Sequence, residues 1–281
     1  MWAVVEEARK HWSFREAKIA WPLAAAYYLL RLYSDSHTAA VEWFSIQQDI
    51  RIYGAMLAAF LIAVGLPRLI CVERERGTDR LICTVEQGRL VTFGAKTAFS
   101  LLYCTVVVLI IGTACLLADY VPYGFNGAFE PVSSCFYFPK NGLPPMSNLA
   151  YCIIQYVFLL LGTWYFAGFV MLLAALTNRT ALTIVLSGGI LAVFFVYCNI
   201  GVWYVDGATW YVCDTLFHLS FGGFMLQESY SWTPFSDQFT SISSLSQRPW
   251  ADVWQPILWV LFVTAAEFIL LWHLWKRRER K

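Results

Sequence analysis

Residues 73–96 read ERERGTDRLICTVEQGRLVTFGAK and separate two long apolar runs of the chain. Acidic and basic side chains crowd its first half, so this stretch lies in water or against another protein rather than in lipid. Arg and Lys placed this close to the ends of apolar segments are typical of a cytoplasmic loop. The stretch therefore predicts a protein that crosses a membrane several times, with this loop on the inner side.

Inside this loop, the residues after Gly77 predict a short amphipathic helix. Gly77 suits a left-handed turn into it, and Thr78 is a good N-cap. Leu81 and Val85 share one face because they are four residues apart, and Gly88 is placed to end the helix. The loop is thus expected to present a small apolar helix face to the cytosol.

The composition independently indicates an integral membrane protein. Of 281 residues, 59% are hydrophobic and only 14% are charged, whereas a soluble domain carries about 25% charged residues. A net charge of +1 gives no argument for a nucleic-acid partner. The eight cysteines show no CxxC pattern, which argues against a zinc site, although a disulfide between Cys135 and Cys213 in predicted outer loops stays open.

The apolar runs predict an all-α fold in a single transmembrane domain over residues 1–281. Residues 1–18 are expected to form an amphipathic interfacial helix, because Val5, Ala8 and Trp12 approximate one face and the aromatic residues Trp2, Trp12 and Phe14 suit headgroup depth. Pro67 should kink the second span near its inner end. Six spans are expected, at about 19–33, 52–72, 97–118, 149–176, 182–200 and 256–275.

The outer segment 201–254 contains an apolar stretch, 208–226, that we do not assign as a span. A further crossing would place the basic C-terminal tail outside the cell. Without it, sixteen of the twenty Lys and Arg residues lie on the inner side, and both termini are cytoplasmic. Residues 208–226 are therefore expected to form a re-entrant or a surface-lying helix.

Few residues suggest a catalytic or ligand-binding role. The chain has no GxxxxGK[ST] phosphate loop and no metal-binding spacing of histidines, so we predict no catalytic, cofactor-binding or metal-binding residues. Ionisable residues at membrane depth are functional candidates. Glu267, in the last span, either faces a pathway or pairs with a basic group such as Arg31, and Asp214 with His218 are candidates for an outer gate.

The E-x-E-x-G-T segment after the second span, the short helix, and a Lys at the start of the third span resemble the ABC-2 type permeases, the six-span membrane subunits of bacterial ABC transporters. The resemblance extends over essentially the whole chain. Members of that family often carry a Pro followed by a basic residue after the short helix, and residues 86–89 of this chain, EQGR, depart from that pattern. The matching residues are Glu73, Glu75, Gly77, Thr78, Leu81 and Lys96.

In such transporters the first inner loop docks into a separate ATPase subunit, and two permease subunits enclose the pathway. The resemblance implies an exporter of an amphiphilic compound, such as a peptide antibiotic, a drug or a lipid-linked compound, in the bacterial cytoplasmic membrane. ATP and Mg²⁺ would bind only to the partner ATPase, the second permease subunit would be identical or homologous, and lipid would be the remaining partner. A membrane-embedded enzyme and a non-transporting scaffold or sensor remain alternatives. Two buried anchors, Leu81 and Val85, and two charges at an exposed rim, Glu73 and Arg80, are expected to contact the ATPase. The remaining expected contacts are Glu75, Gly77 and Thr78.

Overall fold

The computed structural model describes residue 22 and residues 54–78, 88–123, 127–131, 147–196, 216, 219–225 and 254–277. Within these ranges the regular structure is helical, apart from an isolated bridge between Pro131 and Ser147. The helices are α4 (Ala55–Gly65), α5 (Pro67–Glu75), α7 (Gly88–Tyr123), α8 (Asn148–Thr177), α9 (Thr180–Val196), α12 (Phe221–Met225) and α13 (Trp254–Arg277). Several predicted features lie outside the described residues: the interfacial helix 1–18, the first span 19–33 with Arg31, the loop residues Arg80, Leu81 and Val85, and Asp214, His218, Cys135 and Cys213.

The chain is a helical multi-pass membrane protein. In the described part, four helical segments are long and apolar enough to cross a membrane. They overlap the second, third, fourth and sixth predicted spans, and the shorter α9, with 17 residues, overlaps the fifth. The four segments are Ala55–Glu75, Val91–Leu117, Asn148–Thr177 and Ile257–Lys276.

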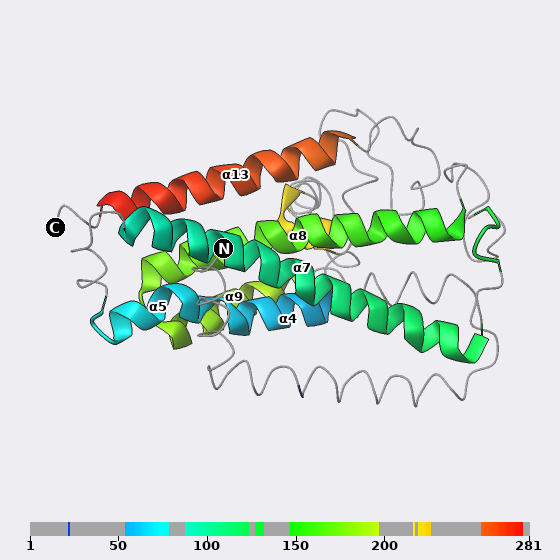
Figure 1. Cartoon of the computed structure of the whole chain (residues 1–281), viewed down its shortest axis with the longest axis horizontal. Helices are drawn as coiled ribbons and strands as arrows, with labels where there is room; N and C mark the ends of the chain where they lie inside the picture. Colours follow the sequence, from blue (N-terminus) through cyan, green and yellow to red (C-terminus); the bar gives the residue numbers. More distant parts are fainter. Residues whose placement is uncertain are drawn as a thin grey trace.

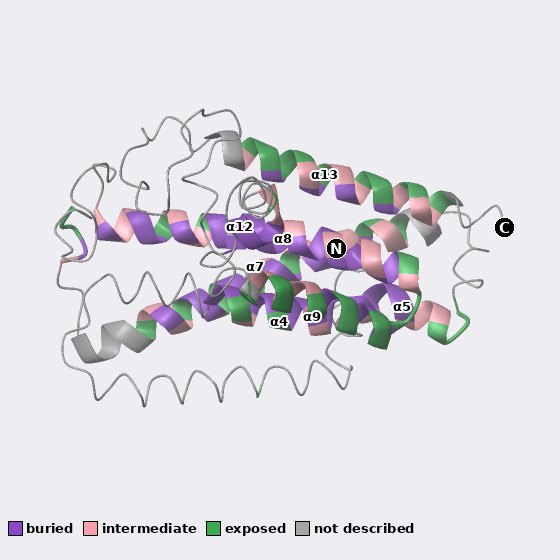
Figure 2. Ribbon diagram, turned by 180° about the vertical axis from the view of Figure 1, so that it is seen from behind, coloured by how far each residue is buried: buried purple, intermediate pink, exposed green. Residues whose placement is uncertain are grey.

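Helix α8 lies at the centre of the bundle and contacts each of the other described helices (Figure 1). Much of α8 is coloured as buried (Figure 2). Its residues Phe158, Phe166 and Val170 are at most 1% exposed. The outer faces of the bundle are also apolar, for example at Leu109 and Phe262, which are 60% and 67% exposed. Hydrocarbon solvates such faces, so both sides of these helices are apolar for different reasons.

The second span is interrupted at Pro67, as the sequence predicts. Proline has no backbone N–H and its ring opposes a continuous helix, so α4 ends at Gly65 and α5 begins at Pro67. Leu66 joins the two helices and its N–H donates to the Ile62 carbonyl at 3.0 Å. Helix α5 is therefore a separate short helix at one end of the bundle, which we call the α5 end.

Helix α7 begins nine residues before the third predicted span. We expected Gly88 to end a short helix and residues 89–96 to belong to the loop. Instead α7 begins at Gly88 and continues to Tyr123, so Lys96 lies inside a helix. The physical reason is that the first turns of α7 extend beyond the most apolar window, where hydropathy gives no signal for a helix.

Helices α8 and α9, which overlap the fourth and fifth predicted spans, form a tight hairpin. Only Asn178 and Arg179 separate them. Asn178 ends α8 in the left-handed conformation, with φ of 58°, and its N–H donates to the Ala174 carbonyl at 3.1 Å. Asn is one of the few residues that adopt this conformation readily, so the hairpin is closed at the α5 end of the bundle.

Candidate functional site

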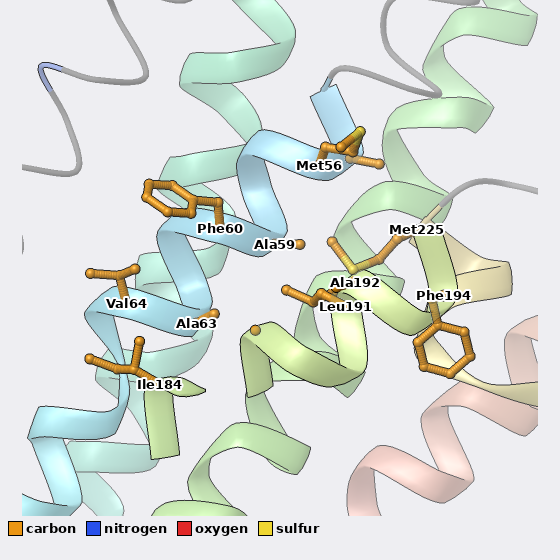
Figure 3. A pocket seen from close by; sticks show the side chains of 13 residues that line it. Met56, Ala59, Phe60, Ala63, Val64, Ile184, Leu191, Ala192, Phe194 and Met225 are labelled. Carbon is orange, nitrogen blue, oxygen red and sulfur yellow. The ribbon is translucent and has the colours of Figure 1, made fainter. Parts of the chain in front are cut away.

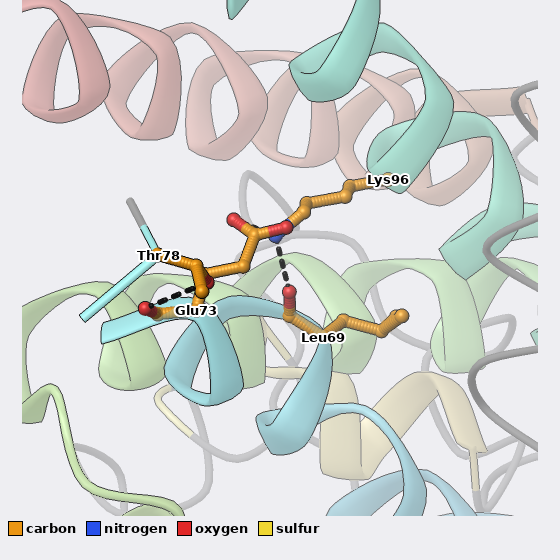
Figure 4. Close-up of polar contacts among 4 residues, drawn as sticks. All are labelled: Leu69, Glu73, Thr78 and Lys96. Carbon is orange, nitrogen blue, oxygen red and sulfur yellow. Dashed lines mark hydrogen bonds and ion pairs between the residues drawn. The ribbon is translucent and has the colours of Figure 1, made fainter. Parts of the chain in front are cut away.

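The loop after α5 starts from a hydrogen-bonded turn. The Gly77 N–H donates to the Arg74 carbonyl at 3.0 Å, and the Thr78 N–H donates to the Glu73 carbonyl at 2.8 Å. These two bonds form a Schellman motif, which requires a left-handed residue, and Gly77 has φ of 67°. The prediction of a left-handed Gly77 is confirmed. The Thr78 hydroxyl also donates to the Glu73 carbonyl, at 3.2 Å, so it closes α5 (Figure 4).

Glu73 forms an ion pair with Lys96 across the interface between α5 and α7 (Figure 4). The Lys96 Nζ lies 2.7 Å from the Glu73 Oε2 and donates to the Leu69 carbonyl at 2.5 Å. The Lys96 side chain is 1% exposed and that of Glu73 is 12% exposed. We expected Glu73 at an exposed rim, and its side chain is instead largely buried, because its partner reaches it from the next helix.

Glu75 binds α9, on the other side of α5 from α7. Its Oε1 accepts a hydrogen bond of 2.7 Å from the backbone N–H of Thr180, the first residue of α9. The first N–H groups of a helix have no partner within it, and a carboxylate at this end is also favoured by the helix dipole. One turn earlier, the Cys71 thiol donates to the Ala174 carbonyl at 3.6 Å. Glu75 and Cys71 therefore attach α5 to the hairpin of α8 and α9.

The E-x-E spacing explains why the two carboxylates have different partners. Residues two apart on an α-helix are separated by about 200° around its axis, so Glu73 and Glu75 lie on opposite faces of α5. Residues four apart share a face, which places Leu69 beside Glu73 and Cys71 beside Glu75. Side chains on one face of α5 thus bind α7, and those on the opposite face bind α8 and α9.

The end of α13 packs against the same region. The ring of Trp275 lies 5.3 Å from the Lys96 Nζ, within the range of a cation–π contact. Phe93, one turn before Lys96 in α7, has its ring centroid 5.0 Å from that of Trp272 and 6.0 Å from that of Trp275. The base of the loop is thus connected by side chains to α7, α9 and α13.

Glu267 lies away from the loop base, between α13 and α8. Its side chain is 8% exposed. It fits there because Gly168 has no side chain: a Cβ at that position would lie 3.2 Å from the Cβ and the Cδ of Glu267. The Oε2 atom has no hydrogen-bond partner among the described residues. The predicted alternative partner, Arg31, is outside them.

An apolar pocket of about 390 Å³ lies between α4, α9 and α12 (Figure 3). Met56 and Phe60 of α4 stand at its open side, with side chains 40% and 41% exposed. Sequence reasoning missed this pocket, because apolar residues in a span carry no mark of a cavity. The available signal was the small residues Ala55, Ala59 and Ala63, spaced four apart on one face of α4.

Helix α12 is buried beside the middle of α8 (Figure 1). A Cβ at Gly162 of α8 would lie 2.7 Å from the Met225 nitrogen, so the two backbones approach closely. The Leu219 carbonyl, just before α12, accepts from the Tyr165 hydroxyl at 3.4 Å and from the Trp259 Nε1 at 3.1 Å. The Leu219 carbonyl, which precedes the bend at Ser220, is therefore satisfied by side chains of α8 and α13.

The described residues contain no group of three or more His, Cys, Asp and Glu side chains that could hold a metal ion. The sequence matches no protein-family model and no curated protein. The structural features that bear on function are the loop base, the apolar pocket and the arrangement of the spans.

Proposed function

We propose that the chain is the membrane subunit of an ATP-driven exporter of the ABC-2 type, and that residues 79–87 dock into a separate ATPase subunit. The observation that supports this most is the construction of the loop base. A loop that only carries topogenic charge needs no fixed geometry. Here a Schellman turn, the Glu73–Lys96 ion pair and the Glu75–Thr180 hydrogen bond set the direction in which the loop leaves α5. Such fixation suits a loop that receives force from a partner.

The α5 end is the cytoplasmic end in this proposal. Arg74, Arg76, Arg179 and Lys276 are among the described cations found there, as the positive-inside rule requires. Helix α9 starts at this end and α13 finishes at it (Figure 1). The connection between them therefore makes no net crossing, which supports a re-entrant or surface-lying segment before the last span and a C-terminus on the same side as the loop.

The apolar pocket supports an amphiphilic substrate. Its lining contains only apolar side chains and glycine, and the lining residues Met56 and Phe60 are 40% and 41% exposed. A compound that partitions into the bilayer would reach it from the side. In a dimer of permease subunits, identical or homologous, this opening would face either lipid or the second subunit.

ATP and Mg²⁺ belong to the partner subunit, because the chain carries no phosphate-binding loop. The principal alternative is a membrane-embedded enzyme that uses Asp214 and His218, and the other is a scaffold or sensor without transport. Neither alternative accounts for a loop whose base is connected to three helices.

The test is co-purification with the ATPase encoded by a neighbouring reading frame that carries a GxxxxGK[ST] motif. Leu81→Asp puts a charge into the proposed apolar contact and should abolish binding while membrane insertion is retained. Arg80→Ala is the matched control, since a rim charge contributes only about 0 to 1 kcal/mol and is screened by salt. Undiminished ATPase binding by Leu81→Asp would refute the proposed docking element.

A further inference from the structure

Lys96 is a buried cation that is paired and hydrogen-bonded. Its Nζ contacts the Glu73 carboxylate, the Leu69 carbonyl and the ring of Trp275, which belong to α5 and α13, while Lys96 itself belongs to α7. Burial of an ammonium group is unfavourable unless it is paired and hydrogen-bonded, and an apolar pair of similar volume is often equally stable. The stability of the fold therefore does not explain why the contact between Glu73 and Lys96 is charged, and we look for another role.

The position of α5 suggests that role. Helix α5 is separated from α4 by the break at Pro67, and the loop begins directly after its last turn. A displacement of the loop therefore acts on α5 before it acts on α4. Glu73 lies in that last turn, and its partner Lys96 is in the helix to which the other end of the loop leads.

We propose that the Glu73–Lys96 ion pair is the positioning contact that transmits a displacement of loop 79–87 to α7 and, through Trp275, to α13. The inference rests on the proposed docking of an ATPase to that loop. A short-range ion pair with hydrogen-bond geometry holds two helices at one distance and orientation, whereas two apolar side chains tolerate sliding. The pair thus makes α5 and α7 move as one body.

The test compares Lys96→Met, Glu73→Met and the double variant in lipid nanodiscs. Either single variant removes one member of the ion pair from a buried site and should lower the thermal midpoint by roughly 10 °C. The double variant places two unbranched apolar side chains in the same space and should restore most of the thermal midpoint that either single variant loses. Arg179→Met, which removes an exposed cation from the same end of the bundle, is the control and should leave the midpoint unchanged.

Transmission is measured with spin labels on non-canonical amino acids. One pair, at Arg76 and Val91, joins the end of α5 to α7, and a second pair, at Val91 and Leu176, joins α7 to α8; all three side chains are exposed. In the wild type the first distance should be narrowly distributed, and the second should change when the ATPase and ATP are added. The double variant should recover stability but show a broad first distribution and no ATP-dependent change in the second.

A double variant that recovers stability and keeps both the narrow distribution and the ATP-dependent change would overturn the inference, since the pair would then be replaceable packing. A different outcome separates the two proposals. If the wild type binds no ATPase, the proposed function fails, and the ion pair is judged on the Arg76–Val91 distribution alone. Broadening in the double variant then supports its positioning role, and an unchanged width refutes it.

Discussion

Replacing Gly162 by alanine tests how closely α12 packs on α8. The added Cβ would lie 2.7 Å from the backbone nitrogen and 3.0 Å from the Cα of Met225, and 2.8 Å from its Cγ. A side-chain atom can rotate away, but the backbone contacts require α12 itself to shift. Overpacking of this kind costs about 1 to 3 kcal/mol. Because alanine also favours the helix by about 1 kcal/mol relative to glycine, the net change must be read against a control.

Gly189→Ala supplies that control. Gly189 is also inside an apolar helix, α9, and a Cβ there would have no neighbour within 4 Å. The difference between the two variants cancels the helix propensity and should equal the 1 to 3 kcal/mol of overpacking, or roughly 2 to 10 °C in the thermal midpoint. Hydrogen–deuterium exchange of residues 219–225 should become faster only in Gly162→Ala. Equal midpoints and equal exchange would show that α12 does not pack on α8 at this depth.

Two further predictions concern the loop base and the α8–α13 interface. Gly77→Val should lower the free energy of unfolding by about 1 to 2 kcal/mol through backbone strain alone, since the φ of Gly77 is 67° and a Cβ would meet no neighbour within 4 Å. Gly77→Asn should lower it less. Equal thermal midpoints for the two variants would exclude a left-handed turn. Glu267→Leu should raise the thermal midpoint relative to Glu267→Gln, because the buried Oε2 has no partner in the described part of the chain and an unsatisfied polar group costs about 1 to 3 kcal/mol. A lower midpoint for Glu267→Leu would instead indicate a hydrogen-bonded partner such as Arg31, as the sequence suggested.

The bounds of the helices were predictable where apolar runs end at residues with a local signal. The fourth predicted span, 149–176, differs by one residue at each end from α8. Ser147 caps its start by accepting from the Ala150 N–H at 3.3 Å, and Asn178 ends it in a left-handed conformation. Such capping residues act within one turn of the chain, so a sequence pattern records them.

The partners of the charged residues were not predictable in the same way. A charge near the end of a span usually indicates solvent, and this led us to place Glu73 at an exposed rim. Its partner Lys96 belongs to another helix, and the Glu75 partner Thr180 belongs to a third. No local periodicity connects these positions, because the contacts depend on how the helices pack.

The E-x-E pattern nevertheless indicates that Glu73 and Glu75 have different partners. If both carboxylates served a single partner surface, they would be expected three or four residues apart, on one face of the helix. A spacing of two places them on opposite faces, where one protein surface cannot reach both. In this chain the two faces meet Lys96 of α7 and Thr180 of α9. The spacing therefore favours a helix held between two neighbours of its own chain, which leaves the residues beyond Thr78 as the part of the loop offered to a partner.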